Sequence, residues 1–191
     1  MKTIKDIHHV AVIGAGVMGR GIALAAALVG YKSTVYDIHP QMLEDAKAYF
    51  EKFLNDSVSR GKMDDASRQK VLDNLKITSH LGDLKADIII EAILENLDLK
   101  QKVLREIEAI NADDAIIASN TSTIPITRIA AGLKNPGRLI GMHFFNPAPI
   151  MKLVEVISGA ATEAWVSDVT FALAKKMGKT PVHAQDEPGF I

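Results

Sequence analysis

Cysteine is absent from the sequence, which excludes a disulfide framework and a catalytic thiolate. The six histidines show no spacing typical of metal ligands, so we expect no bound metal. Apolar runs such as ALAAALV at residues 23–29 are far too short to span a bilayer, and the opening MKTIKDIHH lacks the apolar segment of a secretory signal. We therefore expect a cytoplasmic protein, or a mitochondrial matrix protein if a transit peptide preceded this sequence.

An excess of charge of one sign is also absent. The 22 Lys and Arg residues and the 23 Asp and Glu residues are scattered along the chain and leave a net charge of −1. Because there is no basic cluster for nucleic acid and no cationic amphipathic helix for a membrane surface, we expect neither partner. A chain of 191 residues with 48% hydrophobic content can bury one substantial core, so we predict one domain over residues 1–191.

A glycine motif near the amino terminus is the most specific local signal. An apolar run at residues 10–13 leads into Gly14, Gly16 and Gly19, and an Ala-rich helical segment follows. A Gly-x-Gly-x-x-Gly turn between a strand and a helix brings backbone amides and a helix N-terminus to a dinucleotide pyrophosphate. The alternative is a turn that serves only strand–helix packing. The predicted cofactor contacts at this turn are Gly14, Gly16, Val17, Met18 and Gly19.

Asp37 supports the dinucleotide interpretation. It ends the next apolar run, STVYD, at the offset of about 20 residues expected for a carboxylate that holds a ribose 2′-hydroxyl. A 2′-phosphate would face this carboxylate with no adjacent arginine, so the sequence favours NAD over NADP as the cofactor.

Short apolar runs recur along the chain and are typical of strands buried on both faces. Helical spacing separates several of them, at residues 41–60, 97–110 and 162–177, and Pro125 is placed to open another helix. This alternation predicts an α/β fold with a doubly wound, mostly parallel sheet of the Rossmann type. The predicted strands lie within residues 10–15, 33–37, 86–93, 114–120, 138–145, 152–158 and 180–184.

Two blocks of reactive residue types follow predicted strands, SNTSTIP at residues 119–125 and GMHFFNPAPIMKLVEV at residues 141–156. Ligands of open parallel sheets bind outside the carboxyl ends of the strands, so both blocks should line the nucleotide crevice. His143 can accept a proton and Glu155 can orient it, as a base and its partner. The residues alone are equally consistent with a core histidine, and they favour a surface glutamate.

Five motifs occur in one order: GAGVMGRGIA, EAILENLDLK, ASNTSTIP, HFFNPAPIMKLVEV and KTPVHAQDEPGFI. Together they resemble the NAD-binding domain of the L-3-hydroxyacyl-CoA dehydrogenase family over nearly the whole chain. The resemblance implies oxidation of (S)-3-hydroxyacyl-CoA to 3-ketoacyl-CoA with NAD, in fatty acid β-oxidation and related pathways. The pair HFFNP and KLVEV is specific, whereas many dehydrogenases share the glycine motif.

The resemblance also implies roles for individual residues. His143 matches the family's catalytic histidine, and Glu155 matches its partner glutamate. Ser122 matches a serine that contacts the substrate oxygen, and Asn146 matches an asparagine at the nicotinamide and substrate end. The less favoured alternatives are a turn or cap role for Ser122 and a turn-forming role for Asn146, which precedes a proline.

Further positions match the family's NAD contacts. Glu95 and Lys100 match NAD-binding positions and Asp37 matches the residue on the adenine ribose, while Asn120 lies near enough to reach the cofactor. Against this, Glu95 and Lys100 fit a solvated helix start, and Asn120 fits a residue that only satisfies backbone groups at a strand end.

The sequence stops at PGFI, where the resemblance implies that relatives continue into a helical C-terminal domain that closes over the acyl-CoA and forms a homodimer. With that domain absent, we expect this chain to bind NAD(H), to turn over substrate slowly and to expose an apolar docking surface. Two other functions remain open: another hydroxy-acid or polyol dehydrogenase, such as an L-gulonate dehydrogenase, and a non-catalytic NAD-binding module.

Overall fold

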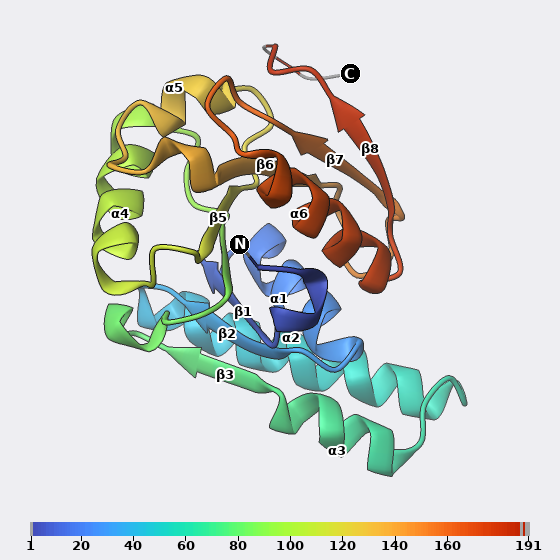
Figure 1. Cartoon of the computed structure of the whole chain (residues 1–191). Coiled ribbons are helices and arrows are strands. Elements are labelled where there is room, and N and C mark those ends of the chain that lie inside the picture. The colour runs from blue at the N-terminus through green and yellow to red at the C-terminus, as the bar shows by residue number, and fades with distance from the viewer. Residues whose placement is uncertain (1, 188, 190–191) are drawn as a thin grey trace.

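A computed structural model describes residues 2–187 and 189 of the chain, which form one eight-stranded sheet flanked by helices (Figure 1). Of the final PGFI motif, only Gly189 lies within the described residues. The strands are β1 (His9–Ile13), β2 (Lys32–Tyr36), β3 (Leu75–Thr78), β4 (Ile88–Glu91), β5 (Ile116–Ser119), β6 (Leu139–Phe144), β7 (Leu153–Ile157) and β8 (Thr180–Ala184). The α-helices are α1 (Val17–Leu28), α2 (Pro40–Ser59), α3 (Asp65–Asp73), α4 (Leu97–Ile110), α5 (Ile126–Ala130) and α6 (Ala164–Lys176), and 3-10 turns cover Ile4–Asp6, Leu81–Asp83 and Pro136–Arg138.

The strand order is β3-β2-β1-β4-β5-β6-β7-β8, which confirms the predicted doubly wound sheet. In this order, neighbouring strands from β3 through β2, β1, β4 and β5 to β6 pair in parallel. Strands β6 and β7 pair antiparallel, and β7 and β8 are again parallel to each other. The chain winds outward from β1 to β3 and then returns beside β1 with β4. This reversal between β1 and β4 is the switch point at which open α/β sheets bind ligands.

Each face of the sheet is covered by its own set of helices. One apolar cluster joins the sheet to α1, α2 and α6, and a second joins it to α4 and α5. Because both faces are covered, the central strands consist of uninterrupted buried residues, as in the IIIE of β4 and the IIAS of β5. The backbone polar groups of these strands are paired within the sheet, and binding chemistry is left to the residues just beyond the strand ends.

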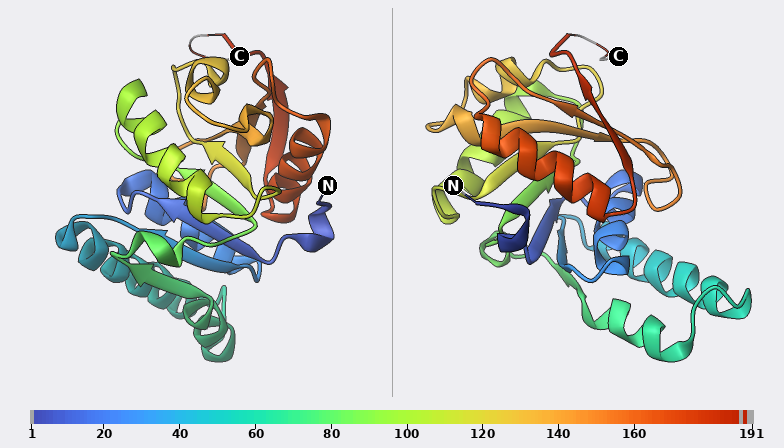
Figure 2. Two further views of the ribbon diagram at one scale, coloured as in Figure 1. Left: turned by 60° about the vertical axis from the view of Figure 1, so that its left-hand side comes forward. Right: turned by 45° about the vertical axis from the view of Figure 1, so that its right-hand side comes forward.

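Helices α2 and α3 form a hairpin that projects from the body of the molecule (Figure 2). The predicted helix at residues 41–60 is confirmed: Pro40 is its first residue, and Gly61 follows it with a φ of +66°. Neither α3 nor β3 was predicted. Only Val71 of α3 is buried, so the helix carries almost no apolar periodicity, and β3 is a four-residue strand at the sheet edge.

The other predicted helices also agree with the structure. Helix α6 falls within the predicted residues 162–177, and α4 matches residues 97–110. Pro125 is the N-cap residue of the short helix α5. No helix in the described part of the chain is both long and apolar enough to cross a membrane.

Candidate dinucleotide and catalytic site

The glycine turn joins β1 to α1 at the switch point. Gly14 has a φ of +95°, and a Cβ there would lie 2.6 Å from the backbone oxygen of Ala92. A Cβ on Gly19 would lie 1.7 Å from the backbone oxygen of Gly14, so neither position accepts a side chain. A Cβ on Gly16 would meet nothing within 4 Å. The backbone is therefore closely packed on its inner side and open at Gly16, as a cradle for a pyrophosphate requires.

Gly16 is also the N-cap residue of α1, and no side chain caps this helix. The first amides of the helix are consequently available to an anion, together with the positive end of the helix dipole. Val17 and Met18 supply two of these amides. The side chain of Val17 is 56% exposed.

Asp37 lies beside this turn, directly after β2. Its Oδ2 accepts a hydrogen bond of 2.8 Å from the Ala15 amide, and its Oδ1 accepts one of 2.9 Å from the His39 amide. Both bonds fix the carboxylate against the glycine turn while lone pairs remain for a ribose hydroxyl. The residues therefore fit the adenosine half of NAD.

A buried carboxylate, Glu91, ends β4 on the other side of the switch point. It is 0% exposed and accepts three hydrogen bonds: 2.7 Å from the Ile93 amide, 2.7 Å from Lys100 Nζ and 2.6 Å from Ser119 Oγ. Glu91 is not among the site residues predicted from the sequence. The available signal was a charged residue inside a continuous apolar strand, which is seldom found without a specific partner.

Lys100 connects Glu91 to a second carboxylate. Its side chain is 1% exposed, and Nζ lies 2.7 Å from Glu91 Oε1 and 3.1 Å from Glu95 Oε2. The alternative of a solvated lysine at a helix start is therefore wrong for Lys100. Its ammonium group holds two carboxylates together at the carboxyl ends of the strands.

Glu95 in turn holds the segment that follows β5. Its Oε1 accepts hydrogen bonds from Thr121 Oγ1 (2.5 Å), from Thr123 Oγ1 (3.0 Å) and from the amides of Ser122 (3.1 Å) and Thr123 (3.2 Å). Burial acts to raise the pKa of Glu95, but the hydrogen bonds from Thr121 and Thr123 and the charge of Lys100 outweigh it and lower the pKa to about 2. The carboxylate is therefore ionised at neutral pH, and Ser122 is held with an exposed side chain.

His143 and Glu155 are direct partners across the antiparallel pair of β6 and β7. The His143 Nδ1 atom lies 2.6 Å from Glu155 Oε2, and the two side chains are 17% and 4% exposed. The sequence alone favoured a surface position for Glu155. That expectation is wrong, because β8 covers the outer side of β7 and leaves Glu155 in the sheet interior. When Nδ1–H donates to the carboxylate, the lone pair of the ring is on Nε2.

Two asparagines lie just beyond the ends of the neighbouring strands β5 and β6. Asn120 Oδ1 accepts a hydrogen bond of 2.8 Å from the Phe144 amide, so it ties the end of β5 to the end of β6. Asn146 follows β6 and is exposed at the same edge of the sheet. The structure thus shows the backbone-satisfying role of Asn120 directly.

Exposed apolar side chains gather at the same edge. They follow β2, β4 and β6 or lie in the first turns of α1 and α4, so the topology places them around the glycine turn and the His143–Glu155 pair. An edge of this kind is typical of a surface covered by a ligand or by another part of a protein. They are Val17, Ile38, Leu94, Leu99, Ile150 and Met151.

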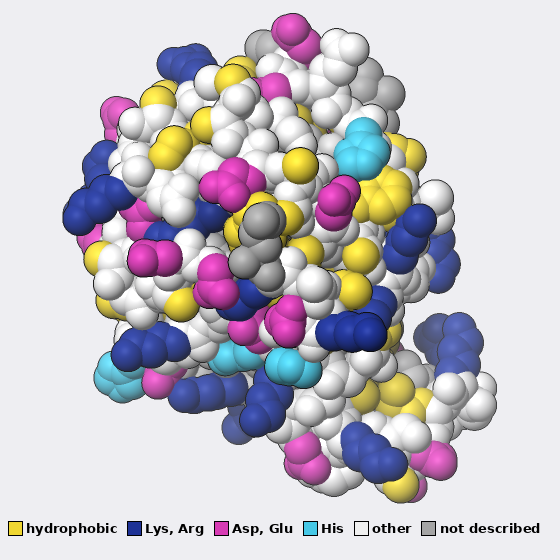
Figure 3. All heavy atoms as spheres, in the orientation of Figure 1, with side chains coloured by type: hydrophobic (Ala, Val, Ile, Leu, Met, Phe, Trp, Pro, Cys, Tyr) yellow, Lys and Arg dark blue, Asp and Glu magenta, His cyan; other side chains and the backbone are white. Residues whose placement is uncertain are grey.

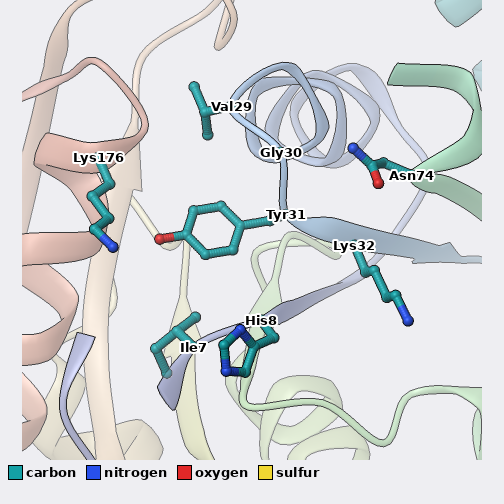
Figure 4. Close-up of a pocket in the computed structure, with 8 residues that line it drawn as sticks. All are labelled: Ile7, His8, Val29, Gly30, Tyr31, Lys32, Asn74 and Lys176. Carbon is teal, nitrogen blue, oxygen red and sulfur yellow. The ribbon is translucent and has the colours of Figure 1, made fainter. Parts of the chain in front are cut away.

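The opposite edge of the sheet carries a shallow cavity of about 640 Å³ beside the amino ends of β1 and β2 (Figure 4). Its lining includes Tyr31, Lys32 and Lys176 but none of the predicted site residues, and the Tyr31 hydroxyl is itself buried. On the face in Figure 3, acidic and basic side chains are interspersed. The chemistry of this chain is concentrated at the carboxyl edge.

A doubly wound sheet that carries a dinucleotide turn at its switch point and a histidine–carboxylate pair at the same edge defines a nucleotide-binding oxidoreductase domain. Comparison with known proteins makes this specific. Residues 9–187 match the family model described as "3-hydroxyacyl-CoA dehydrogenase, NAD binding domain". The chain belongs to this family and is an NAD-binding domain.

Similar proteins include the fatty acid oxidation complex subunit alpha of Psychrobacter cryohalolentis, 44% identical over all of this chain and 27% of that protein. The probable 3-hydroxybutyryl-CoA dehydrogenase of Bacillus subtilis is 43% identical over 97% of this chain and 65% of its own length. The structure of (S)-3-hydroxybutyryl-CoA dehydrogenase from Ralstonia eutropha aligns with a TM-score of 0.94 and 41% identity, over 97% of this chain and 66% of that one. The chain therefore spans between about a quarter and two thirds of these relatives.

Proposed function

We propose that this chain is the cofactor-binding and proton-transferring part of an NAD-dependent 3-hydroxyacyl-CoA dehydrogenase. Its reaction is the oxidation of (S)-3-hydroxyacyl-CoA to 3-ketoacyl-CoA. The observation that carries the proposal is the 2.6 Å contact between His143 and the buried Glu155, at the same sheet edge as the glycine turn. A domain that only bound a nucleotide would gain nothing from an oriented imidazole.

The residues that would hold NAD are the turn from Gly14 to Gly19, with the pyrophosphate at the amino end of α1, and Asp37, with the adenine ribose. When bound, NAD supplies the carbon that accepts a hydride from the substrate. Glu95 and Lys100 contribute by fixing the segment after β5, which borders the same crevice.

His143 acts as the general base in this proposal. Its Nε2 accepts the proton of the substrate hydroxyl as the carbon–hydrogen bond breaks, and the ring becomes an imidazolium. Glu155 stabilises that charge and keeps the ring in the tautomer with its proton on Nδ1. Because Glu155 is only 4% exposed, solvent screens this interaction weakly.

Ser122 and Asn146 bind the substrate in this proposal. Ser122 Oγ donates to the substrate oxygen, and its position is secured by the bond from its own amide to Glu95. Asn146 lies at the nicotinamide and substrate end, together with Asn120. Donors aimed at an oxygen on which charge changes during the reaction lower its barrier.

Because the chain spans only part of each relative, we propose that full activity requires the remainder of such proteins. Enclosure of the acyl-CoA and dimerisation belong to that remainder. The exposed apolar side chains at the carboxyl edge support this division of labour. The bacterial relatives favour the cytoplasm as the location.

The test starts with titrations of NADH and NADPH into the purified chain, followed by nicotinamide fluorescence. Acetoacetyl-CoA is then added to the NADH complex and the absorbance of NADH is recorded. We expect selective binding of NADH and slow, acetoacetyl-CoA-dependent oxidation that is lost in His143→Gln. The matched control is His8→Gln, which removes an exposed histidine at the opposite edge of the sheet.

Two results contradict the proposal. Turnover of a hydroxy acid or polyol without turnover of acetoacetyl-CoA indicates another dehydrogenase on this fold. Oxidation that His143→Gln leaves unchanged indicates that the His143–Glu155 pair is structural. If His143→Gln and His8→Gln both bind NADH selectively but only His143→Gln loses turnover, the result supports His143 as the base.

A further inference from the structure

Lys179 is a buried cation that is not among the proposed catalytic or cofactor-binding residues. It directly precedes β8 and is 8% exposed. Its Nζ donates hydrogen bonds to the backbone oxygen of Ala148 and, over 2.9 Å, to that of Met151. Both acceptors belong to the segment 147–151, which immediately follows Asn146.

The segment 147–151 is folded into a turn and packed against the dinucleotide helix. The Pro147 backbone oxygen accepts bonds of 2.9 Å from the amides of Ile150 and Met151. Ala148 is 2% exposed and belongs to the core. A Cβ on Gly21 of α1 would lie 3.2 Å from Ala148 Cβ and 3.3 Å from Pro149 Cδ, so a side chain there would require the segment to move by a few tenths of an ångström.

The electrostatics of Lys179 are unfavourable. Burial and the neighbouring charge of Lys152 lower the pKa of Lys179. In the described residues, no carboxylate oxygen comes within 4.0 Å of its ammonium group, so the charge is compensated by carbonyl oxygens alone. An apolar side chain of similar length would avoid this desolvation, but it could not hold the two carbonyls.

We propose that Lys179 is a positioning residue for the cofactor site. It fixes the segment 147–151 against α1, and thereby sets the position of Asn146 relative to the glycine turn. The inference rests on the proposed function, because Asn146 matters only if this edge binds the nicotinamide end of NAD. Lys179, at the start of β8, would thus contribute to a site whose other residues follow β1, β5 and β6.

The test compares two ligands that differ at that end. ADP-ribose requires only the glycine turn and Asp37, whereas NADH also reaches the region of Asn146. For Lys179→Met we expect the Kd of NADH to rise about tenfold while that of ADP-ribose changes by less than about twofold, since the loss of charge-assisted hydrogen bonds is confined to one end. Both are measured by calorimetry.

The matched control is Lys152→Met. Lys152 lies at the same junction, is exposed and donates one bond of 3.1 Å to the backbone oxygen of Gly178, so both ligands should bind this variant as they bind the unmodified chain. Asn146→Ala completes a double-mutant cycle. If Lys179 acts through Asn146, adding Asn146→Ala to Lys179→Met should weaken NADH binding no further.

Several results overturn the inference while the proposed function stands. Equal weakening of NADH and ADP-ribose indicates a general structural role. Fully additive losses in the double variant indicate that Lys179 does not act through Asn146, and unchanged NADH binding excludes a role altogether. If Lys179→Met does not fold, Lys179→Gln keeps one donor and undergoes the same comparison. An unmodified chain that binds neither NADH nor ADP-ribose refutes the proposed function itself.

Discussion

Lys100→Met is the substitution that tests the buried Glu91–Lys100–Glu95 cluster most directly. Lys100 is 1% exposed and lies between Glu91, which is 0% exposed, and Glu95. Methionine matches the length of the side chain but removes the charge, which leaves Glu91 buried without a cation. Removing one partner of a buried ion pair costs about 3–5 kcal/mol. For a domain of this size we expect the melting temperature to fall by about 6–20 °C.

The pH dependence of this loss has a defined sign. In the unmodified chain, despite burial, the hydrogen bonds from Thr121 and Thr123 and the charge of Lys100 hold the pKa of Glu95 at about 2, below the ordinary glutamate value of 4.5. Its ionisation therefore stabilises the fold above about pH 4.5, and this contribution is lost as the pH falls from 4.5 towards 2. Without Lys100 the pKa of Glu95 rises, because burial is then opposed by fewer favourable interactions. The destabilisation by Lys100→Met should consequently be large at pH 7 and smaller near pH 4.

The assay is urea denaturation of the unmodified chain, Lys100→Met and the control Lys102→Met at both pH values. Lys102 is an exposed lysine of the same helix, and its replacement should change the free energy of unfolding by less than about 0.5 kcal/mol. Glu91→Gln added to Lys100→Met should recover part of the loss, because the amide carries no charge. A loss below about 1 kcal/mol, or one that does not depend on pH, refutes the reasoning.

Three further predictions concern cofactor and base. Glu155→Gln should lower the rate of acetoacetyl-CoA reduction about 100-fold with little change in NADH affinity, measured by stopped-flow absorbance; a fall in affinity alone speaks against an orienting role towards His143. Asp37→Ala should weaken NADH binding about tenfold and leave NADPH binding nearly unchanged in fluorescence titrations, and equal losses of both count against a ribose contact. Gly19→Ala should lower the melting temperature strongly, whereas Gly16→Ala should melt like the unmodified chain, because of these two glycines only Gly16 has room for a Cβ. Gly16→Ala should nevertheless bind NADH weakly, because the added Cβ occupies the side of the turn proposed for the pyrophosphate, and a lower melting temperature for Gly16→Ala than for Gly19→Ala is the contrary result.

Much of the fold could be predicted because its signals are local. The unit from β1 to Asp37 contains a strand, a glycine turn, a helix and a carboxylate, each with its own sequence pattern. The region of α3 and β3 has no such pattern. Helix α3 buries only Val71, and its stability comes from packing against α2, which the sequence does not display.

The composition of the site was easier to predict than its contacts. His143 and Glu155 stood out by type and by resemblance, but they lie 12 residues apart, and their contact depends on the register of an antiparallel pair. For Lys100, a solvated helix start stayed open as the alternative to a cofactor contact, because its partner Glu91 lies within an apolar strand. Long-range pairs of this kind follow from the assembled sheet rather than from the local chain.

The cross-strand pairing of His143 with Glu155 bears on how the sequence can vary in length. Because the pair is fixed by the register of β6 and β7, residues added to or removed from their connection leave these two side chains opposite each other. One residue inserted between His143 and the end of β6, or between the start of β7 and Glu155, turns one of these side chains to the other face of the sheet. The imidazole of His143 and the carboxylate of Glu155 are then no longer in contact. Among homologous chains, β6 and β7 should therefore be free of gaps from residue 139 to residue 144 and from residue 153 to residue 157.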